Sequence, residues 1–229
     1  WTYETESVAP APASNPTALA LGGGSLWVCD WGGRLLAVDA ADPRRAAGQA
    51  SPQPGGPYRP AAVALGLGVM WTLDAAQARL VRHAASDPAK TLSSRPAPGP
   101  APVALAFDGR TVWSYDAVDR ALTRHAGDDS AQQSFPLPRE VVPNAMVWVE
   151  GRLWVHDVKS RRILLYKFAN GAMSQVGSQP APDAGVLGLA VAGARTDRRV
   201  YALLGPSGGR LQPSIARYRL KTRIPLADF

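Results

Sequence analysis

Aspartates that precede an arginine by four or five residues are the side chains whose type and spacing could do chemistry. They recur along the chain as Asp30, Asp74, Asp116 and Asp157, before Arg34, Arg79, Arg120 and Arg161 or Arg162. Carboxylates gathered in one place would bind a cation or transfer protons. A regular recurrence spreads them apart instead, so we interpret each aspartate as the cap of a turn, paired with the arginine across it.

Three histidines and one cysteine are the other candidates for catalysis or ligand binding. His83 and His125 occupy the same place in two RHA segments, and we expect both to be exposed structural residues. His156 precedes the recurring aspartate, where other copies carry cysteine, leucine or tyrosine, so it is the histidine that departs from the pattern. It is the candidate ligand or acid–base group. Cys29 has no basic neighbour in sequence and is interpreted as a buried apolar residue.

Common catalytic motifs are absent from the sequence. There is no GxSxG, HExxH, P-loop or paired-cysteine pattern. The GGG at 22–24 precedes no helix that could bind phosphate, so we interpret it as a hairpin turn. We therefore predict no catalytic residue, no metal ligand and no cofactor.

The aspartates belong to a larger repeat, and this repeat must position every candidate side chain. Four copies open with a proline, and a tryptophan follows 11 residues later; the tryptophans are Trp27, Trp71, Trp113 and Trp154, spaced 44, 42 and 41 residues apart. Tyr201 takes the place of the tryptophan in a fifth copy, which carries an insertion in GARTDRR. A period of 40 to 47 residues, with strand-like segments and Gly, Pro and Asp turns, is typical of propeller blades.

The predicted fold is an all-β, five-bladed β-propeller of four-stranded antiparallel blades, forming a single domain over residues 1–229. The repeats begin near residues 16, 60, 102, 143 and 186. The first strand of each repeat alternates small with large side chains, as in ALAL, AVAL and ALAF. We expect its small face at the crowded axis and its large face between blades.

Residues 1–8 alternate in side-chain direction and read as a strand that completes the fifth repeat. This closure leaves no long free sheet edge. Glu4 and Glu6 would then oppose three basic side chains of the last repeat, namely Arg217, Arg219 and Lys221.

The net charge of +7 is concentrated at one end of the chain. Residues 195–229 hold eight basic and two acidic side chains, a net of +6. Because the closure does not use Arg195, Arg198 and Arg199, we expect a basic patch that attracts an acidic protein surface or lipid headgroups. A nucleic-acid partner is not expected, since such proteins spread basic and aromatic residues along a face.

Two features of the sequence bear on the cellular location of the protein. The chain begins at Trp1 rather than Met, which fits a processed, exported protein. No run of eighteen apolar residues is present, so we expect no transmembrane segment. We expect a periplasmic or extracellular location, with a cytoplasmic one as the alternative.

The second and third strands of each repeat form hairpins with a recognisable pattern: LWVCDWGGRLLAVD, MWTLDAAQARLVRH, VWSYDAVDRALTRH and LWVHDVKSRRILLYK. These hairpins resemble those of NHL-like and virginiamycin B lyase-like (YVTN-type) bacterial β-propellers. The resemblance implies the propeller fold, but such families include lyases, hydrolases, RNA binders and scaffolds. The lyases use several histidines and a divalent metal near the axis, and this chain lacks the additional histidines.

Two functions from different classes follow. The favoured one is a non-catalytic protein-binding or scaffold propeller in an exported bacterial assembly, contacting its partner through Trp31, Tyr58, Trp148 and the basic last repeat. The alternative is a lyase-like, hydrolase-like or carbohydrate-binding propeller with a face pocket near His156, Tyr115 and Asp116. The first strands carry no carboxylate, which favours the binding function.

Overall fold

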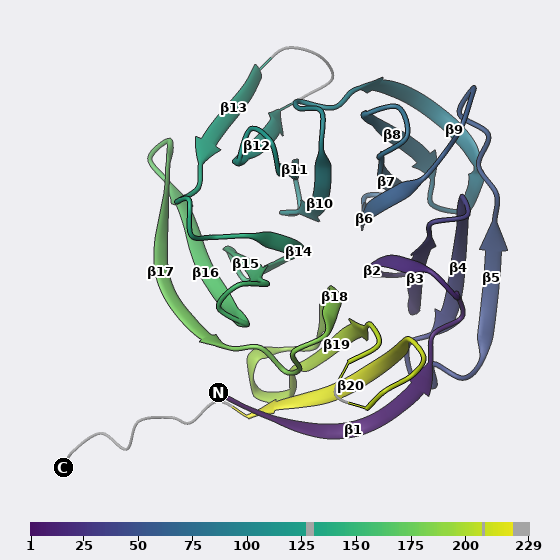
Figure 1. The fold of residues 1–229 in the computed structure, drawn as a ribbon, viewed down its shortest axis with the longest axis vertical. Helices are drawn as coiled ribbons and strands as arrows, with labels where there is room; N and C mark the ends of the chain where they lie inside the picture. Colours follow the sequence, from purple (N-terminus) through teal and green to yellow (C-terminus); the bar gives the residue numbers. More distant parts are fainter. Residues whose placement is uncertain (127–130, 208, 222–229) are drawn as a thin grey trace.

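Five four-stranded sheets surround a central axis in the computed structural model, which describes residues 1–126, 131–207 and 209–221 (Figure 1). All strand pairs within the sheets are antiparallel, which confirms the predicted five-bladed propeller. Within these ranges there is no α-helix, and no helix is long and apolar enough to cross a membrane.

Each blade is a meander that runs outward from the axis. Blade 1 contains β2 (Pro16–Gly22), β3 (Ser25–Asp30), β4 (Arg34–Asp39) and β5 (Ala46–Ala50). Blade 2 contains β6 (Pro60–Gly66), β7 (Val69–Asp74), β8 (Arg79–Ala84) and β9 (Asp87–Pro96). Blade 3 contains β10 (Pro102–Phe107), β11 (Val112–Asp116), β12 (Ala121–Ala126) and β13 (Ala131–Pro136).

The last two blades differ in how their outer strand is supplied. Blade 4 contains β14 (Pro143–Val149), β15 (Arg152–Asp157), β16 (Arg162–Ala169) and β17 (Ala172–Pro180). Blade 5 contains β18 (Val186–Ala192), β19 (Arg199–Leu204) and β20 (Ser214–Lys221), and β1 (Thr2–Pro10) is its outer strand. The insertion predicted in GARTDRR lies between β18 and β19, where Arg195–Asp197 form a short 3-10 helix.

The prolines that open the innermost strands have a local structural reason. In blades 1 to 4 the pairing register shifts directly after the proline, so this residue lies beside a bulge. Proline has no N–H to donate, and a bulge is a position in a sheet where that loss is tolerated. The recurring proline therefore marks the inner corner of each blade.

The small and large faces of the innermost strands pack against each other across neighbouring blades. Leu19 of β2 joins Ala190 of blade 5 in one core cluster, and Val63 of β6 joins Ala18 and Ala20 of β2 in another. A Cβ on Gly188 would lie 2.6 Å from the backbone nitrogen of Leu19, so only glycine fits there. The prediction that the large face packs between blades is confirmed. The small face does not simply line the axis; it receives the large side chains of the next blade, which keeps packing dense.

The N-terminal strand closes the ring as predicted, and it extends to Pro10, beyond residue 8. Glu4 lies opposite Arg219 in the ladder, and its carboxylate is 2.8 Å from Nζ of Lys221. The register shifts between Thr5 and Ser7, and Glu6 at this irregularity contacts three guanidinium groups, those of Arg199, Arg217 and Arg219, at 3.1, 3.0 and 3.6 Å. The predicted acidic–basic pairing is therefore confirmed, and it includes Arg199 as well.

The four repeat tryptophans are not equally buried. Trp113 and Trp154 are 0% and 2% exposed; Trp148 stacks on the first, and the ring of Trp1 lies tilted against the second, with centroids 4.8 Å apart. Trp27 and Trp71 are only half-buried. They border hollows beside their blades where neighbouring side chains leave part of the indole uncovered. The repeat tryptophans are therefore fully buried in blades 3 and 4 and half-buried in blades 1 and 2.

Candidate functional site

The recurring aspartates are structural caps in the folded chain. Asp74 accepts hydrogen bonds from the backbone N–H groups of Ala76 and Arg59, both at 2.9 Å. Asp116 and Asp157 cap their turns in the same way. In Asp157 burial alone would raise the carboxyl pKa, but the hydrogen bonds that it accepts lower it. Each cap ties a hairpin turn to the chain that enters its own blade.

The predicted partner arginines behave differently from blade to blade. Arg34 forms the expected ion pair with Asp30, at 2.7 Å. Arg79, Arg120 and Arg162 turn outward to the fourth strand or the loop beyond it, where they donate to Ser94, Pro138 and Ser178. In blades 2 to 4 the aspartates accept hydrogen bonds from backbone N–H groups instead, so the predicted pairing is seen in blade 1 and not in the described residues of the other three.

His83 and His125 are buried, contrary to the expectation that they are exposed. Nε2 of His83 lies 2.9 Å from Oγ1 of Thr72, and Nε2 of His125 lies 2.8 Å from Oγ of Ser114. Burial lowers the pKa of each imidazole to about 4. The side chains face the interior of the blade because strand alternation directs them away from solvent. A hydroxyl from the neighbouring strand then satisfies one ring nitrogen.

His156 links two blades from a buried position. Its Nδ1 is 2.6 Å from Oδ1 of Asn144, and Nδ2 of Asn144 donates to the carbonyl of Val186 in blade 5 at 2.7 Å. Burial lowers the pKa of His156 to about 4, against the opposing effect of the neighbouring Asp157 carboxylate. Among the residues the structure describes, no group of three or more His, Cys, Asp or Glu side chains is placed to hold a metal ion.

The aromatic residues predicted as contacts fall into three settings. Tyr58 and Tyr115 are buried, and the hydroxyl of Tyr58 donates to Thr72 at 2.7 Å. Trp148 lines the central channel. Trp31 is 40% exposed, with the guanidinium of Arg59 5.3 Å from its ring centroid. Of these residues, Trp31 has the surface exposure that a contact requires.

Of the three arginines predicted to be unused by the closure, two form ion pairs within the protein. Arg198 is buried between blades 4 and 5, where it pairs with Glu150 and lies 5.9 Å from the ring of Trp154. Arg199 contacts Glu6 and Asp197, so the closure does use it. Arg195 is exposed in the 3-10 helix. The basic residue Arg223 and the acidic Asp228 of the charged end lie outside the described residues.

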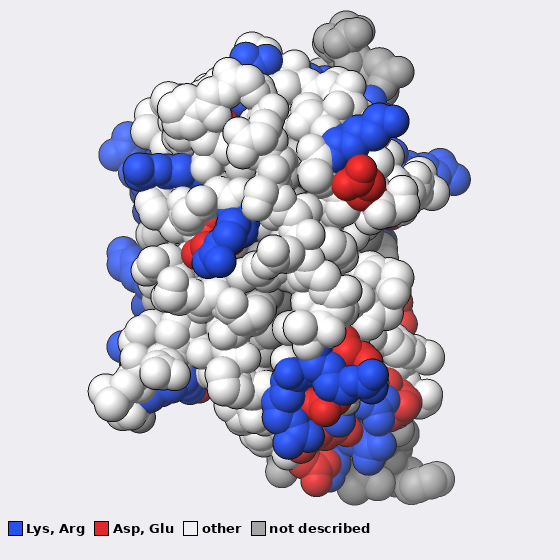
Figure 2. Space-filling model, turned by 90° about the vertical axis from the view of Figure 1, so that its right-hand side faces the viewer, with Lys and Arg blue, Asp and Glu red and all other residues white. Residues whose placement is uncertain are grey.

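On the face drawn in Figure 2, charge is mixed rather than gathered in one basic patch. Acidic and basic side chains intermingle toward the end of the molecule that holds β1 and β20 in Figure 1. Elsewhere on this face the charged side chains are separated by uncharged surface, and some basic ones lie beside an acidic one. The excess of positive charge near residue 195 is therefore neutralised largely within the protein.

The central channel is lined by apolar side chains at one opening. Its opening at the turns after the innermost strands has a volume of about 140 Å³ and takes three consecutive residues from each innermost strand. These are Leu19–Leu21, Val63–Leu65, Leu105–Phe107, Met146–Trp148 and Leu189–Val191. No carboxylate, imidazole or other ionisable side chain belongs to this lining.

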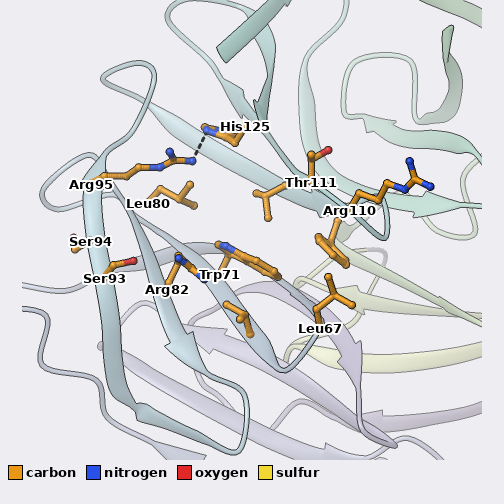
Figure 3. A pocket seen from close by; sticks show the side chains of 13 residues that line it. Leu67, Trp71, Leu80, Arg82, Ser93, Ser94, Arg95, Arg110, Thr111 and His125 are labelled. Atoms are coloured by element: carbon orange, nitrogen blue, oxygen red, sulfur yellow. Dashed lines mark hydrogen bonds between the residues drawn. The ribbon is translucent and has the colours of Figure 1, made fainter. Parts of the chain in front are cut away.

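A larger cleft of about 590 Å³ lies between blades 2 and 3 (Figure 3). Figure 3 shows the indole of Trp71 near its centre, with Arg82 and Arg95 on one side and Arg110 on the other. Trp71 stacks on Phe107 of the next blade, with ring centroids 5.0 Å apart and planes 20° apart. Arg95 donates to Nδ1 of His125 at 3.1 Å. The cleft thus combines apolar rings with cationic and hydroxyl side chains.

The cleft and the channel opening share a lining residue. Phe107 lines both, and Leu67 lines the cleft and a third hollow beside Trp27. Sequence reasoning did not single out Leu67, Trp71, Phe107 and Arg110 as binding residues. One signal was present: the turn GLG in the second repeat carries a leucine where the first repeat has GGG. A large apolar residue in a tight turn is a departure from turn chemistry.

Comparisons with known proteins support the fold but do not show an activity. No protein-family model matches the chain, and no curated protein matches it in sequence. A glutaminyl cyclase from Myxococcus xanthus is similar in structure, with a TM-score of 0.73 at 16% identity over 96% of this chain and 97% of that one. A catalytically inactive virginiamycin B lyase from Staphylococcus aureus, with quinupristin, has a TM-score of 0.57 at 17% identity, over 93% and 69%. A streptogramin B lyase has a TM-score of 0.55 at 13% identity, over 96% and 87%. This chain is therefore similar in fold to lyase-like and cyclase-like β-propellers, as its hairpins suggest.

Proposed function

We propose that this chain is a non-catalytic β-propeller that binds another protein, as a scaffold module of an exported assembly. The observation that carries the proposal is the apolar lining at one opening of the central channel, to which every innermost strand contributes three residues without an ionisable group. General acid–base chemistry needs a titratable side chain within reach of the substrate. A surface with exposed apolar rings beside cationic side chains is better suited to binding a protein.

The histidines also support a binding role. Each of the three is buried and has a neighbour in the fold: Thr72 for His83, Ser114 for His125 and Asn144 for His156. Their lowered pKa values, about 4, keep the rings neutral near pH 7. His83 and His156 line neither the channel opening nor the cleft, and His125 borders the cleft with its Nδ1 accepting a hydrogen bond from Arg95.

Affinity capture from cell-envelope and cytoplasmic fractions of the native host tests the binding role and the location together. The proposal expects one defined partner, recovered in near-stoichiometric amount from the envelope fraction, released at its unmodified mass. Recovery from the cytoplasmic fraction alone would refute the exported assembly. A partner released with a changed mass would show that the propeller acts on it as an enzyme.

An enzymatic role is the second candidate, and the likeness to the glutaminyl cyclase over almost the full length of both chains favours it. Its test is direct turnover of a peptide with an N-terminal glutamine, and of a streptogramin B, followed by mass spectrometry. The binding proposal expects no product above the uncatalysed rate. Product that disappears in a variant of a single channel or cleft residue would establish catalysis instead.

A further inference from the structure

We infer that the surface formed by Leu67, Trp71, Phe107 and Arg110, called here the Leu67 face, docks a segment of a partner protein. The segment places an apolar side chain against the two rings and Leu67, and a carboxylate beside Arg110. This inference rests on the proposed binding function and adds a location and a chemistry to it. Four observations carry it: strain, exposed rings, shape and charge.

Leu67 is held in an unfavourable state by the fold. It is 77% exposed and its φ is 51°, in the left-handed region that non-glycine residues seldom occupy. The other non-glycine residues with positive φ in the described ranges are alanine, arginine, glutamate and asparagine, so Leu67 is the one large apolar side chain among them. Glycine or asparagine would fit this turn better. Strain and exposure together suit a residue that is selected for contact.

Trp71 and Phe107 provide the flat apolar floor beside Leu67. Both are half-buried, and their stacked rings come from different blades, so the floor is rigid without a partner. Rigid aromatic side chains bury large apolar areas at low entropic cost, and such residues dominate binding energy at protein interfaces. The adjoining cleft of about 590 Å³ is large enough to receive a side chain.

The charge beside this floor is positive. Arg110 is exposed and has no ion-pair partner among the residues that the structure describes. The carboxylate of the nearby Asp108 instead accepts hydrogen bonds from Trp113 Nε1 and from Thr111. Arg82 and Arg95 have partners in the chain, so the inference does not depend on them. Within the described part of the chain, no acidic side chain lines the cleft, and an acidic segment is the complementary ligand.

The shape of the surface favours a protein segment over a membrane. The half-buried rings of Trp71 and Phe107 line a hollow, whereas a lipid surface is bound mainly by protruding apolar and basic side chains. A segment with an apolar anchor and an acidic neighbour can fill this hollow and meet Arg110 at its edge.

The test is a selection of short random peptides on the purified full chain, followed by binding measurements of the enriched peptides. We expect enriched sequences with an aromatic or aliphatic residue next to Asp or Glu. The variants are Leu67→Asn, which relieves the backbone strain, and Arg110→Glu. Each should weaken peptide binding by about tenfold or more, the loss typical of a hot-spot residue. Leu67→Asn should keep or raise the Tm, which separates lost contact from lost folding.

Matched controls come from the same chain. Arg152→Glu makes the same charge change at an exposed arginine on the corresponding turn of blade 4, and Leu211→Asn replaces an exposed leucine remote from the cleft. Both should bind the peptides as the wild type does. Equal binding by Leu67→Asn, Arg110→Glu and the controls would overturn the inference, as would the absence of any enrichment.

Two further outcomes separate this inference from the proposed function. A partner that the wild type captures and that Leu67→Asn and Arg110→Glu retain equally well would leave the binding function intact and refute this surface. Vesicles of anionic phospholipid are the second probe. Binding to them that is lost in both variants, without any peptide binding, would assign the face to a membrane and refute the inference.

Discussion

Buried hydroxyl–histidine pairs in blades 2 and 3 show how single residues distinguish otherwise similar blades. The positions of Thr72 and His83 are taken in blade 1 by Val28 and Val38, as the strand registers show. Val28 and Val38 are both buried in an apolar cluster. The polar pair therefore substitutes for an apolar pair in the same geometry, which makes a conversion between the two a clean experiment.

The pH dependence of stability should report on His83. Its pKa is about 4 in the folded chain, below its ordinary value of 6.5, because burial disfavours the charged ring. The unfolded chain therefore takes up its proton first, and stability present above pH 6.5 is lost as the pH falls toward 4. The double variant Thr72→Val with His83→Val should lose about 2 kcal/mol less than the wild type between pH 7 and pH 5.

Urea unfolding at the two pH values measures this difference. The single variant His83→Gln is the control, since it removes the titration and retains a polar side chain. An identical acid-induced loss in the wild type and the double variant would show that His83 titrates normally in the folded state.

The repeat tryptophans give a second prediction at this scale. Trp113 is fully buried against three aromatic rings, and Trp113→Ala should lower the free energy of unfolding by about 3 to 5 kcal/mol. Trp71 is half-buried, and Trp71→Ala should cost markedly less, about 1 to 2 kcal/mol. Denaturant unfolding compares the two. Equal losses would mean that Trp71 is as enclosed as Trp113 in solution.

At the scale of elements, the closing strand is the connection that turns five sheets into a ring. β1 covers the edge of β20 and brings Trp1 against Trp154 and Glu6 against the arginines of blade 5. Without it, the backbone groups of β20 would form a free edge that can pair with another chain. Much of the excess basic charge of blade 5 is paired with Glu4 and Glu6 of the closing strand.

Deletion of residues 1–10 should therefore cause self-association and a lower Tm. Size-exclusion chromatography with light scattering, and thermal unfolding, measure the two effects. A truncated protein that stays monomeric and melts as the wild type does would refute closure by β1.

The two glutamates of the closing strand should contribute unequally. Glu6 contacts three arginines and its side chain is 19% exposed, whereas Glu4 pairs with Lys221 and is 54% exposed. Glu6→Gln should lower the Tm by several degrees and less so in high salt, and Glu4→Gln should change it little. Thermal melts at low and high salt compare them. A larger drop in Tm from Glu4→Gln than from Glu6→Gln would contradict the conclusion that Glu6 stabilises the closing strand more than Glu4.

At the scale of the whole molecule, the repeat made the architecture predictable. The proline-to-tryptophan spacing, the hairpin pattern and the N-terminal strand indicate five blades and their closure, because each depends on local chain geometry. Contacts between blades were harder to predict from the sequence. Burial of Arg198 beside Trp154 and the exposure of Trp71 depend on which side chains of the next blade cover them.

The candidate site was harder to predict for the same reason. Its residues come from turns and strands of two blades, and their significance arises only when Trp71 meets Phe107 across the cleft. A repeat analysis finds what the copies share, such as Trp71, whereas Leu67, Phe107 and Arg110 stand at positions where the copies differ.

Hydrogen–deuterium exchange of the full chain, with and without the partner recovered by affinity capture, tests the account most directly. Binding at the Leu67 face should slow exchange in segments 64–71 and 107–113 and leave exchange unchanged on the opposite face around Trp31. Protection confined to the region of Trp31, or to the closing strand, would contradict the proposed mode of binding.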